Sequence, residues 1–373
     1  MLRSFLILSV LAFTFLLNAS FKPAPKTKPI VLAYVGGFRG LVDTDGIAAE
    51  KLTHINYAFI DVKNNRAWLH NLATDSTNFR KLNNLKLRNP DLKILISIGG
   101  WAWSENFSDA VFSDTSRVAF AASAVDIVRE YQLDGIDIDW EYPGMKGEDN
   151  VFRPEDKENF TLMFKALREQ LDGLTKQTGK KYYVTTALPG FNAIFTHTDM
   201  AKAHQYMDYI NVMAYDHFTG GPLAGHHTNL YATGKVDNEQ SGDNAVKLYK
   251  QAGVPADKLV LGLAFYGRAW QLQNGDPDVH PRTIAKVERG GGYTFIKDSL
   301  LTNPAYKRNW DRKAKAPYLY NADLKQFVSY DDEQSVKEKC RYVKKKGLAG
   351  VMFWEYFSDP KGYLLSEIDR QFQ

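Results

Sequence analysis

Eight short runs with the residue types of β-strands recur along this chain of 373 residues, and stretches with helical spacing of apolar residues lie between them. The runs begin at Ile30, Thr53, Leu92, Leu133, Tyr182, Met207, Lys258 and Leu348. Strands that alternate with helices along a chain form parallel sheets. The pattern therefore predicts an α/β fold, either a closed (β/α)8 TIM barrel or a large doubly wound sheet.

One interval breaks the regular spacing. The seventh and eighth runs begin 90 residues apart, which is too long for a single crossover helix. Residues 269–330 within this interval contain turn signals and aromatic strand-like segments. We expect them to form a small α+β insertion domain between strand 7 and helix 7, on the rim where barrel enzymes keep their sites. Residues 29–373 as a whole would form the catalytic barrel.

The first residues resemble an export signal. Arg3 precedes an apolar run from Phe5 to Leu17, and small residues follow at Ala19 and Ser20. We expect residues 1–20 to be a signal peptide and residues 21–28 a linker, so that the protein is secreted or periplasmic and has no stable membrane insertion after signal removal. A retained single membrane anchor is the alternative. Cys340 is the only cysteine, which excludes an internal disulfide.

Charge and composition exclude several classes of partner. The net charge is +4, with 47 basic and 43 acidic residues. Because these residues are dispersed along the chain, they do not indicate the basic patch of a nucleic-acid-binding protein. We read the run Lys344-Lys345-Lys346 as the solvated end of a helix. His226 and His227 have no accompanying acidic ligand pattern, so we interpret them as surface residues and expect no metal. No cofactor is predicted, and the chain is expected to be a monomer.

The segment "LDGIDIDWEYPG", residues 133–144, places acids in an otherwise apolar strand. Because side chains alternate along a strand, Asp137, Asp139 and Glu141 project to one face. The bulky residues Ile136, Ile138 and Trp140 project to the other. A row of three acids on a central strand is costly to bury unless protons or donors satisfy it. This segment is therefore the leading candidate for a catalytic site.

Several other predicted strands end in residues that packing alone would not select. Because the carboxyl ends of barrel strands meet on one rim, we expect these side chains to surround a common cavity. Aromatic rings and carboxylates together suit a carbohydrate, since sugar rings stack on aromatics while their hydroxyls bond to charged groups. The candidate substrate-binding residues are Tyr34, Phe59, Gly100, Trp101, Met213, Asp216, Tyr266, Arg268, Met352 and Trp354.

These residues also carry a family resemblance. "DGIDIDWE" matches the Asp-x-x-Asp-x-Asp-x-Glu signature of family 18 glycoside hydrolases, the chitinases, and "SIGG" matches their Ser-x-Gly-Gly motif. "MAYD", "FYGR" and "GVMFWEY" resemble the same family's segments on strands six, seven and eight. The resemblance extends from Val31 to about Tyr356. The long insertion is similar to that of the subfamily with deep substrate grooves.

Glu141, at the exit of its strand, is the candidate general acid, because a carboxylate array and partial burial raise the pKa of a carboxyl group. The spacing of Asp139 and Glu141 in the sequence does not exclude that Asp139 acts as the nucleophile of an ordinary retaining glycosidase. The resemblance implies instead that the substrate's 2-acetamido oxygen attacks, while Asp139 orients that group with help from Tyr215 and Asp137 takes a shared proton.

The resemblance also implies places for the sugar. Trp354 would form the floor beneath the distorted ring, Asp216 and Arg268 would bind sugar or acetamido groups, and Trp101 would stack on the leaving-group side. The implied activity is retaining, endo-acting hydrolysis of chitin or N-acetylglucosamine oligomers.

The segment after strand six departs from the family's commoner loop. In "DHFTGGPLAGHHTNLY", His217 stands between Asp216 and Phe218, which leaves the leaving-group side of the groove undefined. Three alternatives remain: an endo-β-N-acetylglucosaminidase acting on glycoprotein chitobiose cores, a non-catalytic chitin-binding barrel, and a metal-dependent polysaccharide deacetylase. The presence of Glu141 opposes the second, and the lack of a His/Asp ligand set opposes the third.

Overall fold

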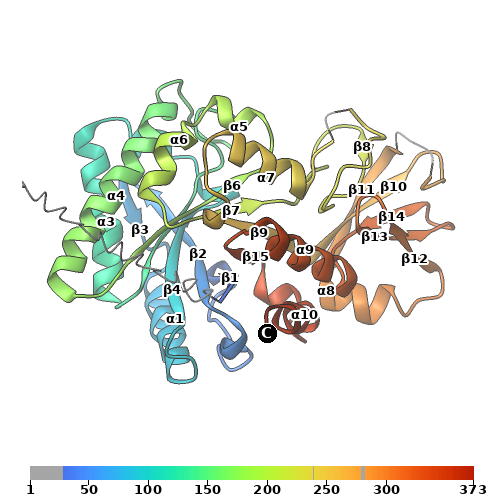
Figure 1. Cartoon of the computed structure of the whole chain (residues 1–373), viewed down its shortest axis with the longest axis horizontal. Coiled ribbons are helices and arrows are strands. Elements are labelled where there is room, and N and C mark those ends of the chain that lie inside the picture. Colours follow the sequence, from blue (N-terminus) through green and yellow to red (C-terminus); the bar gives the residue numbers. More distant parts are fainter. Residues whose placement is uncertain (1–27, 238, 279–281) are drawn as a thin grey trace, which may run out of the picture.

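The computed structural model describes residues 28–237, 239–278 and 282–373. The predicted signal peptide and most of the predicted linker lie outside these residues. Eight parallel strands form a closed barrel, the left-hand part of Figure 1, in the spatial order β1-β15-β9-β7-β6-β5-β4-β2, with β1 also pairing with β2. They are β1 (Ile30–Gly36), β2 (His54–Lys63), β4 (Lys93–Gly99), β5 (Gly135–Asp139), β6 (Tyr183–Pro189), β7 (Tyr209–Met213), β9 (Leu259–Ala264) and β15 (Gly350–Trp354). The predicted TIM barrel is confirmed.

Helices pack around the outside of the barrel. The longer ones are α1 (Leu72–Asn84), α3 (Asp114–Glu130), α4 (Asp156–Thr178), α7 (Gly242–Gln251), α9 (Glu333–Lys346) and α10 (Tyr363–Phe372). Short helices are α2 (Phe107–Ala110), α5 (Ala193–Thr196), α6 (Met200–Ala203) and α8 (Tyr293–Phe295), and β3 (Arg66–Trp68) pairs antiparallel with β2. Among these described helices, none is long and apolar enough to cross a membrane.

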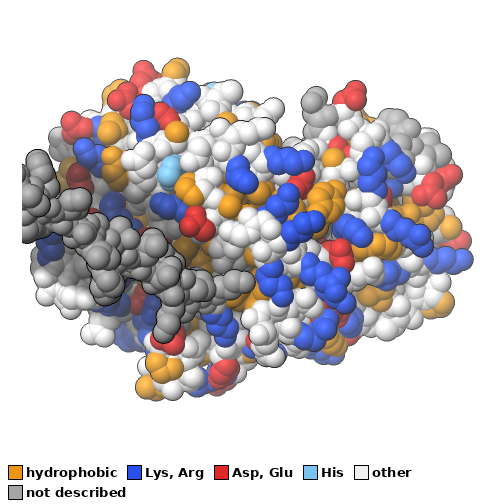
Figure 2. All heavy atoms as spheres, viewed as in Figure 1, with side chains coloured by type: hydrophobic (Ala, Val, Ile, Leu, Met, Phe, Trp, Pro, Cys, Tyr) orange, Lys and Arg blue, Asp and Glu red, His pale blue; other side chains and the backbone are white. Residues whose placement is uncertain are grey.

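Local sequence determines where the helices begin and end. Ser113 and Asp332 accept hydrogen bonds from the third residue of α3 and α9, respectively, in capping boxes. Gly347 ends α9 in the left-handed conformation. The preceding Lys344–Lys346 run is exposed, as predicted for a solvated helix end, and Figure 2 shows lysine and arginine side chains over this side of the molecule.

The acid-bearing strand β5 has the predicted two faces. Ile136, Ile138 and Trp140 are fully buried in the core between the barrel and its helices, and the Trp140 ring stacks on Phe107 with centroids 5.2 Å apart. Asp137 and Asp139 face the barrel interior side of the same strand. Hydrophobic burial on the outer face therefore holds the acids in place on the inner face.

A second sheet stands beside the barrel (Figure 1). Its strand order is β12 (Tyr306–Asp311), β13 (Ala316–Asn321), β14 (Gln326–Ser329), β10 (Tyr266–Leu272), β11 (Arg282–Gly292) and β8 (Leu223–Ala224). The prediction that strand seven runs through Tyr266 is wrong. The barrel strand β9 ends at Ala264, and Tyr266 and Arg268 lie on β10 of the second sheet. The short strand β8, which comes from the loop after β7, also joins this sheet.

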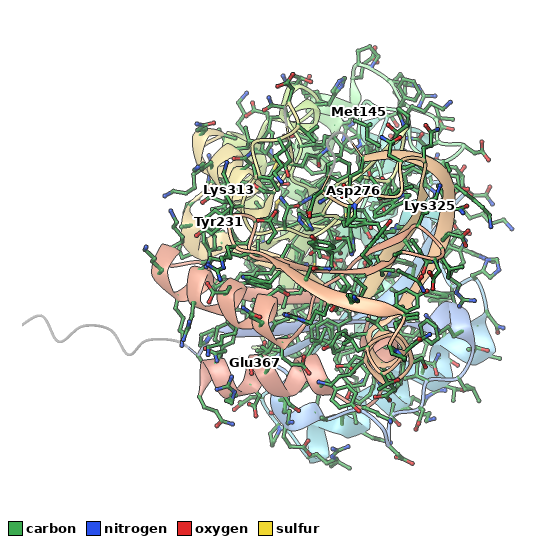
Figure 3. The ribbon with its side chains drawn as sticks, turned by 90° about the vertical axis from the view of Figure 1, so that its right-hand side faces the viewer. Met145, Tyr231, Asp276, Lys313, Lys325 and Glu367 are labelled. Carbon is green, nitrogen blue, oxygen red and sulfur yellow. The ribbon has the colours of Figure 1, made fainter. Side chains whose placement is uncertain are left out.

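The segment from Gly225 to Tyr231, which we call the connecting segment, ties the second sheet to the barrel. The backbone N–H groups of Leu230 and Tyr231 both donate to Ala314 O at 3.1 Å. Figure 3 labels Tyr231 and Lys313 at this junction, where they lie close together. Thr228 donates to Asp331, which forms a buried ion pair with Lys339 of α9 at 2.7 Å.

The interpretation of His226 and His227 as surface residues is wrong. Both side chains are buried, with 1% and 0% relative exposure. His226 Nε2 lies 3.4 Å from Asp311 Oδ2 on β12, and His227 Nδ1 lies 3.4 Å from Asp216 Oδ1. The two histidines were misread because the connecting segment reads as a polar loop, whereas in the fold it is covered by the second sheet.

Candidate active site

A cavity of about 1150 Å³ opens at the carboxyl ends of the barrel strands, between the barrel and the second sheet. Most of the predicted site residues line it. From the barrel strands and the loops that follow them come Tyr34, Phe59, Trp101, Asp139, Glu141, Met213, Tyr215, Asp216 and Trp354, and from β10 come Tyr266 and Arg268. Its volume lies slightly above the range of about 300–1,000 Å³ that is typical of small-molecule sites.

Three predicted residues lie behind the cavity wall instead of lining it. Asp137 and Met352 are fully buried, and the Tyr215 hydroxyl lies 3.8 Å from Met352 Sδ. Gly100 has a φ of +83°, and a Cβ there would stand 2.6 Å from the Phe59 ring. Only glycine fits this position, so Gly100 shapes the backbone between β4 and Trp101.

Asp137 lies at the base of the site and is saturated with hydrogen-bond donors. Its Oδ2 accepts from the Tyr34 hydroxyl at 2.9 Å and from Ser97 Oγ at 2.7 Å. Its Oδ1 accepts from Thr185 Oγ1 at 2.5 Å and from Asn211 Nδ2 at 3.1 Å. Burial raises the pKa of Asp137, and these four donors oppose that effect.

Asp139 and Glu141 stand above Asp137 on the same strand face. Burial, with the charges of Glu141 and Asp137, holds the pKa of Asp139 well above its usual range. Its Oδ1 is buried and has no hydrogen-bond partner. Burial also raises the pKa of Glu141 to about 7, with a contribution from the charge of Asp216. Glu141 can therefore carry a proton near neutral pH, and it faces the cavity.

Asp216 forms a charged pair with Arg268 on the opposite wall. The carboxylate accepts from Arg268 Nε at 2.9 Å and Nη2 at 2.6 Å, and from the Tyr266 hydroxyl at 2.7 Å. Burial acts to raise the pKa of Asp216, but His227 and Arg268 together hold it well below its usual range. The Asp216 charge is thus fixed at any pH at which Glu141 titrates.

Aromatic rings form one side of the cavity. The Trp354 indole lies nearly parallel to Phe59 and Phe38, with centroids 5.4 and 6.2 Å away. Tyr34 packs against Trp354 at 5.8 Å. Trp101, which also lines the cavity, is 49% exposed and meets the edge of Tyr142. Flat apolar surfaces are therefore available in the same cavity as Asp139 and Glu141.

Several residues that line the cavity were not predicted from the sequence. They are Phe38, Trp103, Tyr142, Phe191, Phe218 and Gln240. Most of these residues lie a few positions after the end of a barrel strand, and this position could have indicated that they line the cavity. Gln240 follows the connecting segment and carried no comparable signal. Across the described ranges, no group of three or more His, Cys, Asp or Glu side chains could hold a metal ion.

A family model described as glycosyl hydrolases family 18 matches residues 30–359. The chain belongs to family 18 of the glycosyl hydrolases. The match contains the barrel, the second sheet and every candidate site residue. The fold and the acid row thus lie within a family of glycoside hydrolases, and the resemblance drawn from the motifs is confirmed.

Two curated relatives and one solved structure illustrate this membership. Chitinase A1 of Niallia circulans is 42% identical over 76% of this chain, which corresponds to 43% of that protein. Chitinase 1 of Aphanocladium album is 32% identical over 85% of this chain and 78% of its own length. A family 18 N-acetylglucosaminidase from Paenibacillus barengoltzii superposes with a TM-score of 0.84 and 39% identity, covering 92% of this chain and 99% of that one.

Proposed function

We propose that this family 18 protein is a chitinase that hydrolyses β-1,4-linked N-acetylglucosamine chains with retention of configuration. The observation that carries the proposal is the pairing of Glu141, whose pKa is raised to about 7, with the unpartnered Oδ1 of Asp139 in one aromatic cavity. A proton donor and a free acceptor on the same strand face match what cleavage of an acetamido sugar requires.

In the proposed first step, Glu141 protonates the oxygen of the scissile glycosidic bond. The bond breaks as the acetamido carbonyl oxygen of the same sugar attacks the anomeric carbon, giving an oxazolinium ion. Glu141, now ionised, then takes a proton from water, which opens the ion from the face the leaving group vacated. The two inversions at the anomeric carbon give net retention.

Asp139 would act on the acetamido group and not on the sugar carbon. Its Oδ1 accepts the acetamido N–H and balances the positive charge of the oxazolinium ion. Tyr215, which is neutral because burial holds its pKa well above the usual range, donates from its hydroxyl to the acetamido oxygen. Asp137 keeps the proton that the two aspartates share when Asp139 turns toward the substrate.

The remaining residues would position the chain. Trp354 supplies a flat surface under the sugar whose bond is cleaved, and Trp101 supplies one on the leaving-group side. The fixed pair of Asp216 and Arg268 bonds to hydroxyl or acetamido groups. Met213 and Tyr266 complete the wall between these two ends.

Incubation with N-acetylglucosamine tetramers and hexamers, with and without a chelator, tests the proposal. We expect shorter oligomers in both cases and the β-anomer as the first product by NMR. A chelator-sensitive release of acetate would indicate the deacetylase instead. Cleavage of a glycoprotein core but not of the oligomers would indicate the endo-β-N-acetylglucosaminidase.

A second candidate is release of single N-acetylglucosamine units from the chain end. The Paenibacillus barengoltzii N-acetylglucosaminidase favours it, because that match covers 92% of this chain and 99% of the other. Time courses on the hexamer separate the two activities. Early monomer with pentamer supports end-wise release, whereas early dimers, trimers and tetramers support internal cleavage.

We also propose that the protein is exported by residues 1–20. The support is the order of a basic residue, an apolar run and small residues in this segment. N-terminal sequencing of the protein recovered from the culture medium or periplasm of its natural host tests this. A mature N-terminus near residue 21 would support export, and an intact Met1 on a membrane-bound protein would contradict it.

A further inference from the structure

Asn211 is a buried residue of β7 inside the barrel, and the sequence analysis gave it no role. Its Nδ2 donates to Asp137 Oδ1 at 3.1 Å and to the Tyr34 hydroxyl at 3.2 Å. Its Oδ1 is fully buried and has no hydrogen-bond partner. The amide therefore uses its donor end fully and leaves its acceptor end unused.

Hydrogen-bond accounting shows which state of Asp137 this arrangement suits. Four donors reach the carboxyl group, from Tyr34, Ser97, Thr185 and Asn211, and together they occupy the lone pairs of an ionised carboxylate. A protonated Asp137 is itself a donor and needs an acceptor. None of these four donors is a group that only accepts. Among the described residues, two buried amide oxygens nearby have no partner: Oδ1 of Asn211, and Oδ1 of Asn56, which lies beside Tyr34 on β2 and does not bond to Asp137.

The hydroxyl groups of Ser97 and Thr185 are poor candidates for that acceptor. Ser97 Oγ and Thr185 Oγ1 direct their described hydrogen bonds to Asp137 itself. If either accepted the Asp137 proton, its own hydroxyl proton would need a new acceptor in a fully buried position. An unmade hydrogen bond there is costly.

A half-turn of the Asn211 amide solves the problem. It exchanges Oδ1 for Nδ2, so that Oδ1 faces Asp137 and Tyr34 and accepts from both. A proton on Oδ1 of Asp137 then reaches Asn211 directly. A proton on Oδ2 reaches it through the Tyr34 hydroxyl, which accepts from Asp137 and donates to Asn211. One buried amide atom lacks a partner before and after the turn, so the turn itself changes little else.

We propose that Asn211 is a positioning residue whose amide turns over when Asp137 takes the shared proton, which stabilises both protonation states of Asp137 during the reaction. The inference rests on the proposed function, because the proton settles on Asp137 only when Asp139 turns toward an acetamido sugar. No proton is gained or lost by the pair, since Asp139 becomes ionised as Asp137 becomes neutral.

The kinetic test compares Asn211→Leu with the wild type and with Thr186→Val. Leucine matches the size of asparagine but offers neither donor nor acceptor. Thr186 is also fully buried, on the neighbouring strand β6, and bonds to Ile138 O instead of Asp137, so it controls for loss of a buried polar group. A thiazoline analogue of the oxazolinium ion serves as the probe of the state with Asp137 protonated.

We expect Asn211→Leu to lower kcat and thiazoline affinity in parallel, by about tenfold to a hundredfold, because it leaves the buried O–H of protonated Asp137 without an acceptor, whereas the ionised carboxylate of the free enzyme keeps three of its four donors. Binding of a fully deacetylated oligomer, which offers no acetamido group for Asp139 to turn toward, should stay within about twofold. Thr186→Val should leave kcat and thiazoline affinity unchanged. Asn211→Asp should recover activity at low pH, where its protonated carboxyl can accept and donate, and lose it as the pH rises.

A neutron structure of the wild type gives a readout that does not depend on how the variants fold. We expect Nδ2 of Asn211 to face Asp137 in the free enzyme and Oδ1 to face it with the thiazoline bound. The same orientation in both, or an Asn211→Leu variant with wild-type kcat and thiazoline affinity, would overturn the inference. A wild type that neither cleaves oligomers nor binds the thiazoline would instead refute the proposed function.

Discussion

The activity should fall as the pH rises through about 7, because the proposed acid must carry a proton to act. Burial raises the pKa of Glu141 from 4.5 to about 7, with a further contribution from the charge of Asp216. At pH 7 about half of the molecules then hold the proton, whereas a carboxyl at its ordinary value would hold it in about 0.3%. The shift corresponds to about 3 kcal/mol in favour of the protonated form.

The assay is kcat/KM on a soluble N-acetylglucosamine oligomer from pH 5 to 9, since this parameter reports groups in the free enzyme. We expect activity at pH 8 to be about a tenth of its limiting value and to fall a further tenfold by pH 9. Asp216→Asn removes a negative charge that raises the pKa of Glu141, so its alkaline limb should move to lower pH. A wild-type profile that is flat to pH 9, or an Asp216→Asn limb at higher pH, would refute this reasoning.

Three further outcomes are expected. Glu141→Gln should abolish nearly all turnover, by about 10²-fold or more. It should also raise the Tm more at pH 8 than at pH 5, because the stability cost of the raised Glu141 pKa grows as the pH rises from 4.5 and is complete only above about 7. A folded variant with near-normal hydrolysis would exclude Glu141 as the acid. Trp354→Ala should weaken oligomer affinity and turnover, and unchanged affinity with a lower Tm would assign Trp354 to the core alone. Lys339→Met should lower the free energy of unfolding in urea by about 3–5 kcal/mol, since it leaves the Asp331 carboxylate buried without its ion-pair partner. The double variant Lys339→Met with Asp331→Asn should recover part of that loss. Equal stability of the single and double variants would contradict the role of the ion pair.

The barrel and the acid row could be predicted because their signals are local. Each barrel strand is a short apolar run, and the alternation of Asp137, Ile138, Asp139 and Trp140 states which side chains face inward. The position of a residue at the end of a strand was also enough to place Tyr34 and Trp354 in the cavity. These inferences need only periodicity and the geometry of parallel barrels.

What could not be predicted depends on contacts between distant segments. His227 reads as part of a polar loop, and only the second sheet reveals that it is buried behind Asp216. The end of β9 at Ala264 was not predicted because "LAFYGR" continues the strand pattern without a break. In the structure, Tyr266 pairs with β11 and therefore belongs to the second sheet. Asn211 has an ordinary strand position, and its importance follows from a side-chain contact with Asp137.

The central claim is that the substrate's own acetamido group attacks while Asp139 steadies it. The most direct measurement compares cleavage of an N-acetylglucosamine hexamer with cleavage of the fully deacetylated hexamer, at equal occupancy of the enzyme. We expect the deacetylated chain to bind but not to be cut, because it lacks the attacking oxygen. Efficient cleavage of the deacetylated hexamer would instead make Asp139 an ordinary nucleophile.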